Sequence, residues 1–314
     1  MTIAVLPASQ KVHLDGRLPD WVDARFFETA DELLALAPEA EIGWFDYFVD
    51  GPGTTVEAVR RAEKLRWLVT IGAGLDYLPV DVLVERGVTI TKGAGLSAAP
   101  IAEYVVMLML AFAKDYRTVM RAQERRDWLN DAPGKRQLAG SKALVIGYGA
   151  IGRALGQRLR AFDVEVTPVS RSGGDGILRA DEWQGHLGEF DWVILSAPAT
   201  AETQHMIGAA ELAAMKQDGV LVNVARGTLV DSPALVEALT TRRIAGALLD
   251  VTDPEPLPDD HPLWAFDNVH VTMHLSGRAQ DTVYARAAER FLANLEPYRA
   301  GRQPEPVYDP TTGY

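Results

Sequence analysis

The chain contains no cysteine, which excludes disulfide bonds and any thiol chemistry. It also lacks long apolar runs, because the longest, residues 104–113, is too short to span a bilayer. The first residues show no basic segment followed by an apolar core, so a signal peptide is not expected. These absences predict a soluble cytoplasmic protein with no membrane partner.

An excess of positive charge is lacking as well. The net charge of −12 argues against nucleic-acid binding by general electrostatics. It leaves open an anionic substrate that is held by local arginines. The length of 314 residues predicts two domains, and a hydrophobic content of 47% can supply two cores.

Short apolar runs alternate with helical patterns along the whole chain. The expected strands are 2–6, 41–45, 66–71, 88–91, 143–146, 164–169, 192–196, 220–224, 246–249 and 269–272. The expected helices include 31–36, 54–61, 101–117, 153–162, 209–215, 232–240 and 282–298. This alternation predicts parallel sheets in doubly wound α/β domains.

A glycine fingerprint, VIGYGAIG, follows the apolar run 143–146 and precedes a helical stretch. Gly147 suits a tight turn, Gly149 lets the backbone approach a phosphate, and Gly152 lets the helix pack close to the strand. The N–H groups at the helix start then face the anion. The pattern predicts a Rossmann dinucleotide site, although such turns also serve purely structural ends. Its expected cofactor-binding residues are Gly147, Tyr148, Gly149, Ala150, Ile151 and Gly152.

The position of the fingerprint in mid-chain indicates how the two domains are organised. About 95 residues with four expected strands come before the fingerprint's domain, and the final helix can cross back to them. We therefore expect a smaller flavodoxin-like substrate domain, 1–97 plus 282–314, with the dinucleotide domain 98–281 inserted into it. Both are expected to be doubly wound, with cofactor and substrate in the crevice between them.

An acidic residue is missing where the strand 164–169 ends. An NAD site usually places Asp or Glu there to bond the ribose 2′-hydroxyl. This chain has Ser170, Arg171 and Ser172 instead. The guanidinium of Arg171 can pair with a 2′-phosphate, and no carboxylate repels that phosphate. We expect NADP as cofactor, with NAD as the alternative, and a solvated loop arginine is the competing interpretation.

Three charged residues stand out beyond the fingerprint. Arg226 and His274 lie at the far ends of apolar strands, where ligands gather in open α/β sheets, and Glu255 lies in a proline-rich loop. A surface ion pair is the alternative for Arg226, and a solvated side chain is the alternative for Glu255. His270 is the rival of His274, because the two alternate on one face of the expected strand.

Several of these segments together resemble the D-2-hydroxyacid dehydrogenase family, specific for the D isomer, and within it the glyoxylate/hydroxypyruvate reductases. The matching segments are VIGYGAIGRALGQRL, NVARGTLVD, GALLDVTDPEPLPDDHPLW and NVHVTMHLSG, with weaker likeness in TIGAGLDYL and AEYVVMLMLA. The resemblance implies the two-domain fold, Arg–Glu–His catalysis by Arg226, Glu255 and His274, and a two-fold homodimer through the dinucleotide domain. The family usually has proline where this chain has Met273, which leaves the path of that loop open.

Each catalytic role has a physical reason. Reducing a 2-oxo acid needs a hydride at C2, which a nicotinamide carries, and a proton on the oxygen. His274 is the natural proton donor, since histidine ordinarily titrates near pH 6.5. Glu255 would orient the ring, and Arg226 would hold the substrate carboxylate.

Further residues are expected at the same site. The glycine-rich loop after the strand 66–71 resembles the family's carboxylate loop, so Ala73 and Gly74 are expected to bind substrate, with a structural turn as the alternative. Remaining cofactor contacts are expected at Ala197, Pro198, Asn223 and Asp250. The aromatic residues Trp44, Phe45, Tyr47 and Phe48 are expected either to shape the substrate pocket or to lie in the core. No metal site is expected.

The leading interpretation is an oxidoreductase that reduces a small 2-oxo acid, such as glyoxylate or hydroxypyruvate, to the D-2-hydroxy acid with NADPH. A second is an NAD-dependent enzyme similar to phosphoglycerate dehydrogenase. A third is a dinucleotide-sensing protein without turnover, against which the retention of Arg226, Glu255 and His274 argues.

Overall fold

The chain divides into two compact units, each with its own sheet. The computed structural model describes residues 1–45, 51–72, 74–75 and 77–309. Unit 1 comprises Met1–Ser97 and Ala279–Tyr314, and unit 2 comprises Ala98–Arg278. The second junction therefore lies three residues before the expected one. Both sheets are parallel, which confirms the predicted doubly wound α/β class.

Unit 1 contains a five-stranded parallel sheet in the order β2-β1-β3-β4-β5. Its strands are β1 (Thr2–Pro7), β2 (Val22–Phe27), β3 (Ile42–Gly43), β4 (Trp67–Val69) and β5 (Thr89–Thr91). Its helices are α1 (Lys11–Leu14), α2 (Ala30–Leu36), α3 (Pro52–Arg61), α4 (Val80–Glu85) and α10 (Gln280–Arg299). This strand order is that of flavodoxin-like sheets.

Helices cover both faces of this sheet. Buried side chains of α2, α3 and α4, such as Leu33 and Leu83, pack on one face, while α1 and α10 cover the other. Phe291 of α10 stacks on Trp67 at 5.3 Å and lies 5.7 Å from Trp44, measured between ring centroids. Because α10 belongs to the C-terminal segment, the core of unit 1 is built from both ends of the chain.

Two of the four aromatic side chains that were considered for a substrate pocket lie in the described part of the chain, and both are core residues. Trp44 and Phe45 are almost fully buried, in the two clusters on opposite faces of the sheet. The pocket interpretation is therefore wrong for these two. Tyr47 and Phe48 lie outside the described residues.

Strand β2 was not expected, so unit 1 has five strands instead of four. It is an edge strand that pairs only with β1, in parallel. Its middle carries polar side chains, and Arg25 forms ion pairs there with Asp23 and Glu39. Charged residues are common on edge strands, because they protect the unpaired edge from other chains. They also hide the apolar pattern that marks a strand.

Unit 2 contains a seven-stranded parallel sheet in the order β12-β11-β10-β9-β6-β7-β8. Its strands are β6 (Lys142–Ile146), β7 (Glu165–Ser170), β8 (Leu178–Arg179), β9 (Trp192–Leu195), β10 (Val220–Asn223), β11 (Gly246–Leu249) and β12 (Val269–Val271). Its helices are α5 (Ala98–Ala113), α6 (Tyr116–Arg125), α7 (Ala150–Arg160), α8 (Ala209–Ala214) and α9 (Ser232–Thr240). The order 8-7-6-9-10-11-12 is the Rossmann order with one strand added. Only the two-residue edge strand β8 was missed.

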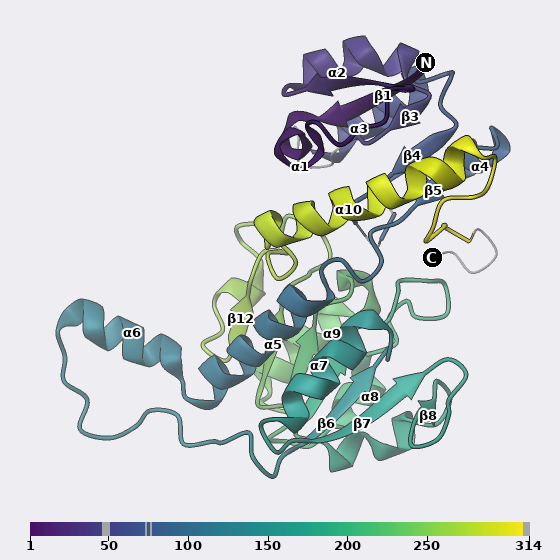
Figure 1. Ribbon diagram of the computed structural model, residues 1–314. Helices are drawn as coiled ribbons and strands as arrows, with labels where there is room; N and C mark the ends of the chain where they lie inside the picture. Colours follow the sequence, from purple (N-terminus) through teal and green to yellow (C-terminus); the bar gives the residue numbers. More distant parts are fainter. Residues whose placement is uncertain (46–50, 73, 76, 310–314) are drawn as a thin grey trace. The chain divides into compact units, whose positions relative to one another are not determined.

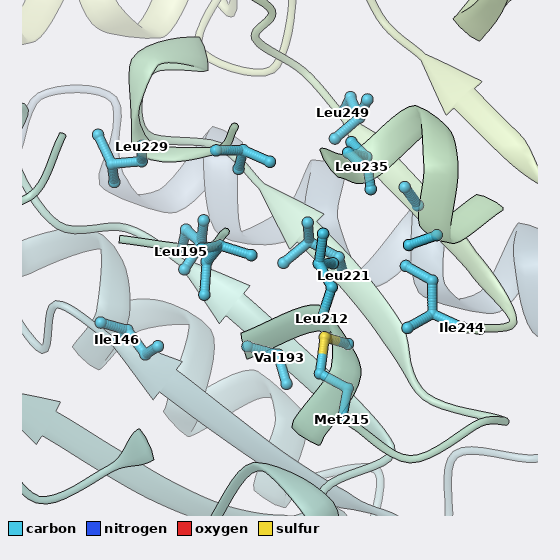
Figure 2. Packing of buried hydrophobic residues seen from close by; sticks show 14 of the residues in the cluster. Ile146, Val193, Leu195, Leu212, Met215, Leu221, Leu229, Leu235, Ile244 and Leu249 are labelled. Atoms are coloured by element: carbon cyan, nitrogen blue, oxygen red, sulfur yellow. The ribbon is translucent and has the colours of Figure 1, made fainter. Parts of the chain in front are cut away.

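Alternate residues of the unit 2 strands face opposite layers of helices. On β6, Leu144 and Ile146 join the cluster that contains α8 and α9. Ala143 and Val145 join the cluster that contains α5 and α7. Figure 2 shows part of the first cluster, in which side chains of β6, β9, β10 and β11 pack against those of α8 and α9. Burial on both faces explains why these strands read as continuous apolar runs.

The expected helix 101–117 is two helices. α5 ends at Ala113, and α6 begins after Asp115, whose left-handed backbone (φ 43°) and side chain cap the new helix. Figure 1 shows α6 and the segment after it extending away from the sheet of unit 2. Among the helices of the described residues, none is both long and apolar enough to cross a membrane.

Candidate active site

The glycine fingerprint joins the end of β6 to the start of α7, as predicted. A Cβ on Gly147 would lie 2.4 Å from the nitrogen of Ala197, and one on Gly152 would lie 2.3 Å from the oxygen of Gly147. A Cβ on Gly149 would meet nothing within 4 Å. Two glycines therefore permit close packing, and the third leaves open space at the helix N-terminus. This is the arrangement that a pyrophosphate requires.

Tyr148 contributes its backbone to the fingerprint, while its side chain lies along α7. Its N–H donates to the oxygen of Val169 at 2.9 Å. Its hydroxyl accepts a hydrogen bond from Arg160 Nη1 at 3.1 Å, above Gly156. Arg153 reaches back to the Tyr148 oxygen at 3.1 Å. Sequence reasoning passed over Arg153, although its position directly after the last glycine of the fingerprint marks it as a cation near this loop.

The other expected cofactor residues lie beside the fingerprint. Ser170 ends β7, and Arg171 and Ser172 follow it in an exposed loop. Ala197 and Pro198 follow β9, on the other side of β6. Because the strands are parallel, all three turns lie at the same edge of the sheet.

Arg226 occupies a turn that its neighbours hold in place. The buried Asn223, at the end of β10, donates from Nδ2 to the Arg226 oxygen at 2.8 Å and accepts from the Ala225 N–H at 3.0 Å. A Cβ on Gly227 would lie 1.9 Å from the oxygen of Thr252. Only glycine lets this turn approach the loop after β11 so closely. Asn223 therefore has a structural task here, and its expected cofactor contact stays a prediction.

Glu255 belongs to that loop, and both carboxylate oxygens are engaged. Oε1 accepts from the N–H of Thr252 at 3.1 Å, and Oε2 lies 2.9 Å from Nδ1 of His274. Burial alone would raise the pKa of Glu255. The hydrogen bond and charge of His274, the Thr252 N–H and the charge of Arg226 outweigh it, and the pKa lies below its usual 4.5. The carboxylate is thus ionised at neutral pH, so Nδ1 donates and Nε2 remains for proton exchange.

The loop that carries His274 is held by Asp250, which is almost fully buried. Its carboxylate accepts from the hydroxyl of Thr272 at 2.8 Å, from the N–H of Leu275 at 3.0 Å and from both the N–H and the hydroxyl of Ser276. Its carbonyl accepts from the N–H of His274 at 2.6 Å. Asp250 therefore positions the loop, and its expected contact with the cofactor stays a prediction.

This network supports an uncommon backbone. Met273 and His274 both have positive φ, 54° and 58°. Such a residue costs on the order of 1–3 kcal/mol and persists only where its surroundings hold it. A proline ring fixes φ near −65°, so proline cannot adopt this path at position 273. Met273 therefore allows a path for this loop that proline would forbid.

His270 is not placed on the same face as His274. Strand β12 ends at Val271, and the two left-handed residues then redirect the chain. The His270 ring lies 5.9 Å from that of Phe112, edge to face. Burial and the charge of Arg117 lower the pKa of His270, against a smaller opposite effect of Asp115. The expectation of a shared face is therefore wrong, and no carboxylate hydrogen bond is found for His270 among the described residues.

Three neighbouring strands thus present the three charged residues at one edge. Arg226 follows β10, Glu255 follows β11, and His274 follows β12, and these strands are adjacent in the sheet. The fingerprint follows β6 at the same edge. An arginine, an ionised carboxylate and an imidazole held by that carboxylate can bind an anion and exchange a proton.

The expected carboxylate loop belongs to unit 1 and follows β4. The Thr70 hydroxyl donates to the oxygens of Gly72 and Thr91, and the N–H of Gly93 donates to the Gly72 oxygen at 2.7 Å. The N–H of Gly74 has no acceptor among the described residues, which suits a donor for a ligand. Ala73 lies outside those residues.

Comparison with known proteins identifies the class. The model of the D-isomer specific 2-hydroxyacid dehydrogenase, NAD binding domain, matches residues 106–276. This stretch is more than half of the chain and contains the fingerprint and all three charged residues. The chain belongs to this family of NAD(P)-dependent oxidoreductases, which act on CH–OH donors.

Individual relatives agree with the family. An uncharacterised protein from the proB 3′ region of Corynebacterium melassecola is 36% identical over 286 residues, covering 85% of this chain and 90% of that protein. A glyoxylate reductase from Thermofilum pendens is 33% identical over 260 residues, covering 79% and 76%. A solved D-isomer specific 2-hydroxyacid dehydrogenase from Xanthobacter autotrophicus Py2, in complex with NADPH and MES, has a TM-score of 0.78 and 29% identity, covering 100% of both chains.

Proposed function

We propose that the chain reduces a small 2-oxo acid, such as glyoxylate or hydroxypyruvate, to the D-2-hydroxy acid and prefers NADPH. The observation that carries the reaction is the hydrogen-bonded pair of His274 and Glu255 beside Arg226. A dinucleotide sensor would need neither a carboxylate-oriented imidazole nor an arginine directed at substrate. The T. pendens relative, a glyoxylate reductase, supports the choice of a small substrate.

Each residue has one task in this reaction. Arg226 holds the carboxylate of the 2-oxo acid and polarises the neighbouring carbonyl through charge-assisted hydrogen bonds. A bound nicotinamide supplies the hydride. His274 delivers a proton from Nε2 to the carbonyl oxygen, while Glu255 stabilises the imidazolium and fixes the ring. The N–H of Gly74 in unit 1 is assigned to the substrate carboxylate.

A turnover assay tests the proposed substrate and direction. The panel contains glyoxylate, hydroxypyruvate, pyruvate and 2-oxoglutarate with NADPH, and D- and L-2-hydroxy acids with NADP. D-3-phosphoglycerate with NAD tests the competing dehydrogenase. We expect the highest kcat/KM for glyoxylate or hydroxypyruvate. Glyoxylate gives achiral glycolate, so the D configuration is tested with the products of hydroxypyruvate and pyruvate, which should be the D isomers only. Turnover of D-3-phosphoglycerate alone, or no turnover of any compound, would contradict the proposal.

The preference for NADPH rests on Arg171, Ser170 and Ser172. We expect Arg171→Ala to weaken NADPH binding by roughly 1.5–3 kcal/mol, the range for a hydrogen bond to a charged group. NADH binding should barely change, because NADH has a hydroxyl in place of the phosphate. Titration of both cofactors against the wild type and the variant measures this. Equal losses for both cofactors, or a wild type that prefers NADH, would refute the preference.

We also propose a two-fold homodimer through unit 2. The segment from α6 onward extends away from the sheet and carries an almost fully exposed Trp128, 91% accessible, next to Leu129. Light scattering should give twice the chain mass of 34.3 kDa. Trp128→Ser should shift the mass towards the monomer, whereas Val12→Ser, at the exposed Val12 of unit 1, should not. A wild type that is monomeric at micromolar concentration would count against the dimer.

A further inference from the structure

Strand β8 places a second arginine beside the expected 2′-phosphate residues. It pairs in parallel with the end of β7, and its last residue, Arg179, is opposite Ser170 in the register. Strand β7 lies between β6 and β8 in the sheet. Arg179 is therefore level with the carboxyl edge at which the fingerprint and the loop after β7 lie.

The stem of Arg179 lies across that loop. Gly173 has a left-handed backbone (φ 66°), and a Cβ there would lie 2.6 Å from Cγ of Arg179. The loop is closed beneath the stem by the N–H of Gly173, which donates to the Ser170 oxygen at 3.3 Å. Arg179 thus lies against Gly173, the residue that directly follows Arg171 and Ser172 in this loop.

An ion pair orients the guanidinium of Arg179 without using all of its donors. Nε lies 3.0 Å from Oδ1 of Asp181, and Nη2 lies 3.3 Å from Oδ2. This pair occupies two of the five N–H donors, so three remain. The two side chains are 59% and 69% exposed, and an ion pair so exposed to water is weak. A phosphate can therefore share or take over this guanidinium.

We propose that Arg179 is the second cation of the 2′-phosphate site. Asp181 orients the guanidinium of Arg179 before the cofactor binds. This inference rests on the proposed NADPH preference and names a residue that determines it. A phosphate monoester carries close to two negative charges at neutral pH, and Arg171 alone balances one of them. Two guanidinium groups match this charge. The carboxylates of Asp181 and Glu182 near Arg179, and of Glu202 near Arg171, reduce the affinity for the phosphate.

The test is equilibrium binding of NADPH, NADH, adenosine 2′,5′-bisphosphate and 5′-AMP. The last two ligands lack the nicotinamide and differ only in the 2′-phosphate, so comparing their Kd values measures the contribution of that phosphate. We expect Arg179→Ala to raise the Kd of NADPH and of the bisphosphate about tenfold, a typical factor for one charge-assisted hydrogen bond. The Kd of NADH and of 5′-AMP should change less than twofold. Arg179→Lys should fall between, because it keeps the charge and loses the fork.

Asp181→Asn should act in the opposite direction and lower the Kd of NADPH about twofold to fivefold, since it removes a negative charge near the phosphate. A residue that only stabilises the loop would not give opposite signs for the two variants. Arg61→Ala is the matched control, because Arg61 forms a comparably exposed ion pair with Glu57 in unit 1. It should leave all four Kd values unchanged.

The outcomes separate this inference from the proposed function. If the wild type binds the bisphosphate no more tightly than 5′-AMP, the NADPH preference fails and the inference fails with it. If the wild type prefers the bisphosphate and Arg171→Ala removes that preference, but Arg179→Ala stays within twofold of wild type, only the inference is wrong. Equal weakening of all four ligands by Arg179→Ala would likewise overturn it.

Discussion

We expect His274→Ala to lose most of its turnover while it still binds NADPH. General acid catalysis contributes about 10²–10⁴-fold to a rate, so kcat should fall by a factor in that range. The Kd of NADPH should stay within about twofold, because the fingerprint and the phosphate residues follow other strands. Steady-state kinetics and a binding titration on the same preparation measure both quantities.

His270→Ala is the control for this experiment, because its ring packs against Phe112 and has no carboxylate partner among the described residues. It should keep most of the activity at a temperature well below unfolding. A dead His270→Ala variant beside an active His274→Ala variant would show that the wrong histidine has been assigned.

The pH dependence gives the assignment a second, independent test. Reduction needs the protonated ring, so the rate should fall as the pH is raised. The pKa of Glu255 lies below 4.5, so this carboxylate stays charged throughout the fall and cannot be its source. Glu255→Gln removes the charge that favours imidazolium, and the fall should move to lower pH. An unmoved profile would refute the role of Glu255.

The second large effect is expected at the fingerprint, where two glycines should respond in different ways. Gly149→Ala should leave the unfolding temperature nearly unchanged, because its new methyl group meets no protein atom within 4 Å. It should nevertheless raise the Kd of NADPH and of NADH by about tenfold or more, since the methyl group occupies the approach of the pyrophosphate.

The Gly147→Ala variant should instead be less stable than the wild type. The residue has φ 95°, and the new Cβ would lie 2.4 Å from the Ala197 nitrogen. Strain and overlap together should lower the free energy of unfolding by about 3 kcal/mol or more. Thermal melts and cofactor titrations of both variants separate the two effects. If Gly149→Ala lost stability and kept its cofactor affinity, the assignment of the open space to pyrophosphate would be wrong.

Prediction of the fold from the sequence was most accurate where a strand buried on both faces leads into a turn that requires glycine. The strands beneath the fingerprint were found because burial on both faces leaves an uninterrupted apolar run. The fingerprint itself was found because three glycines at this spacing, between a strand and a helix, are typical of a phosphate-binding turn. Strands β2 and β8 were missed for the opposite reason. They are edge strands, one carrying paired charges and the other only two residues long.

The remaining differences arise from contacts that the apolar pattern of the sequence does not display. The expected strand 269–272 ends close to where β12 does, but no local pattern indicates that Met273 and His274 adopt a left-handed backbone in a loop that Asp250 holds. The pairing of Ser170 with Arg179 is likewise a matter of register, which a single sequence does not display. Helix 101–117 divides at Asp115 because that side chain caps a new helix, a choice that its apolar periodicity does not reveal.

The insertion of unit 2 has a consequence for how the protein is made on the ribosome. Unit 2 is one continuous segment, so it can complete its sheet as soon as its last strand emerges. Unit 1 lacks α10, and with it Phe291 over Trp67, until residues 280–299 have been synthesised. At about 5–20 residues per second, the N-terminal strands wait roughly 10–40 s for that helix. During this time the apolar side chains that α10 later covers stay exposed, so unit 1 completes its core only after the whole of unit 2 has been synthesised.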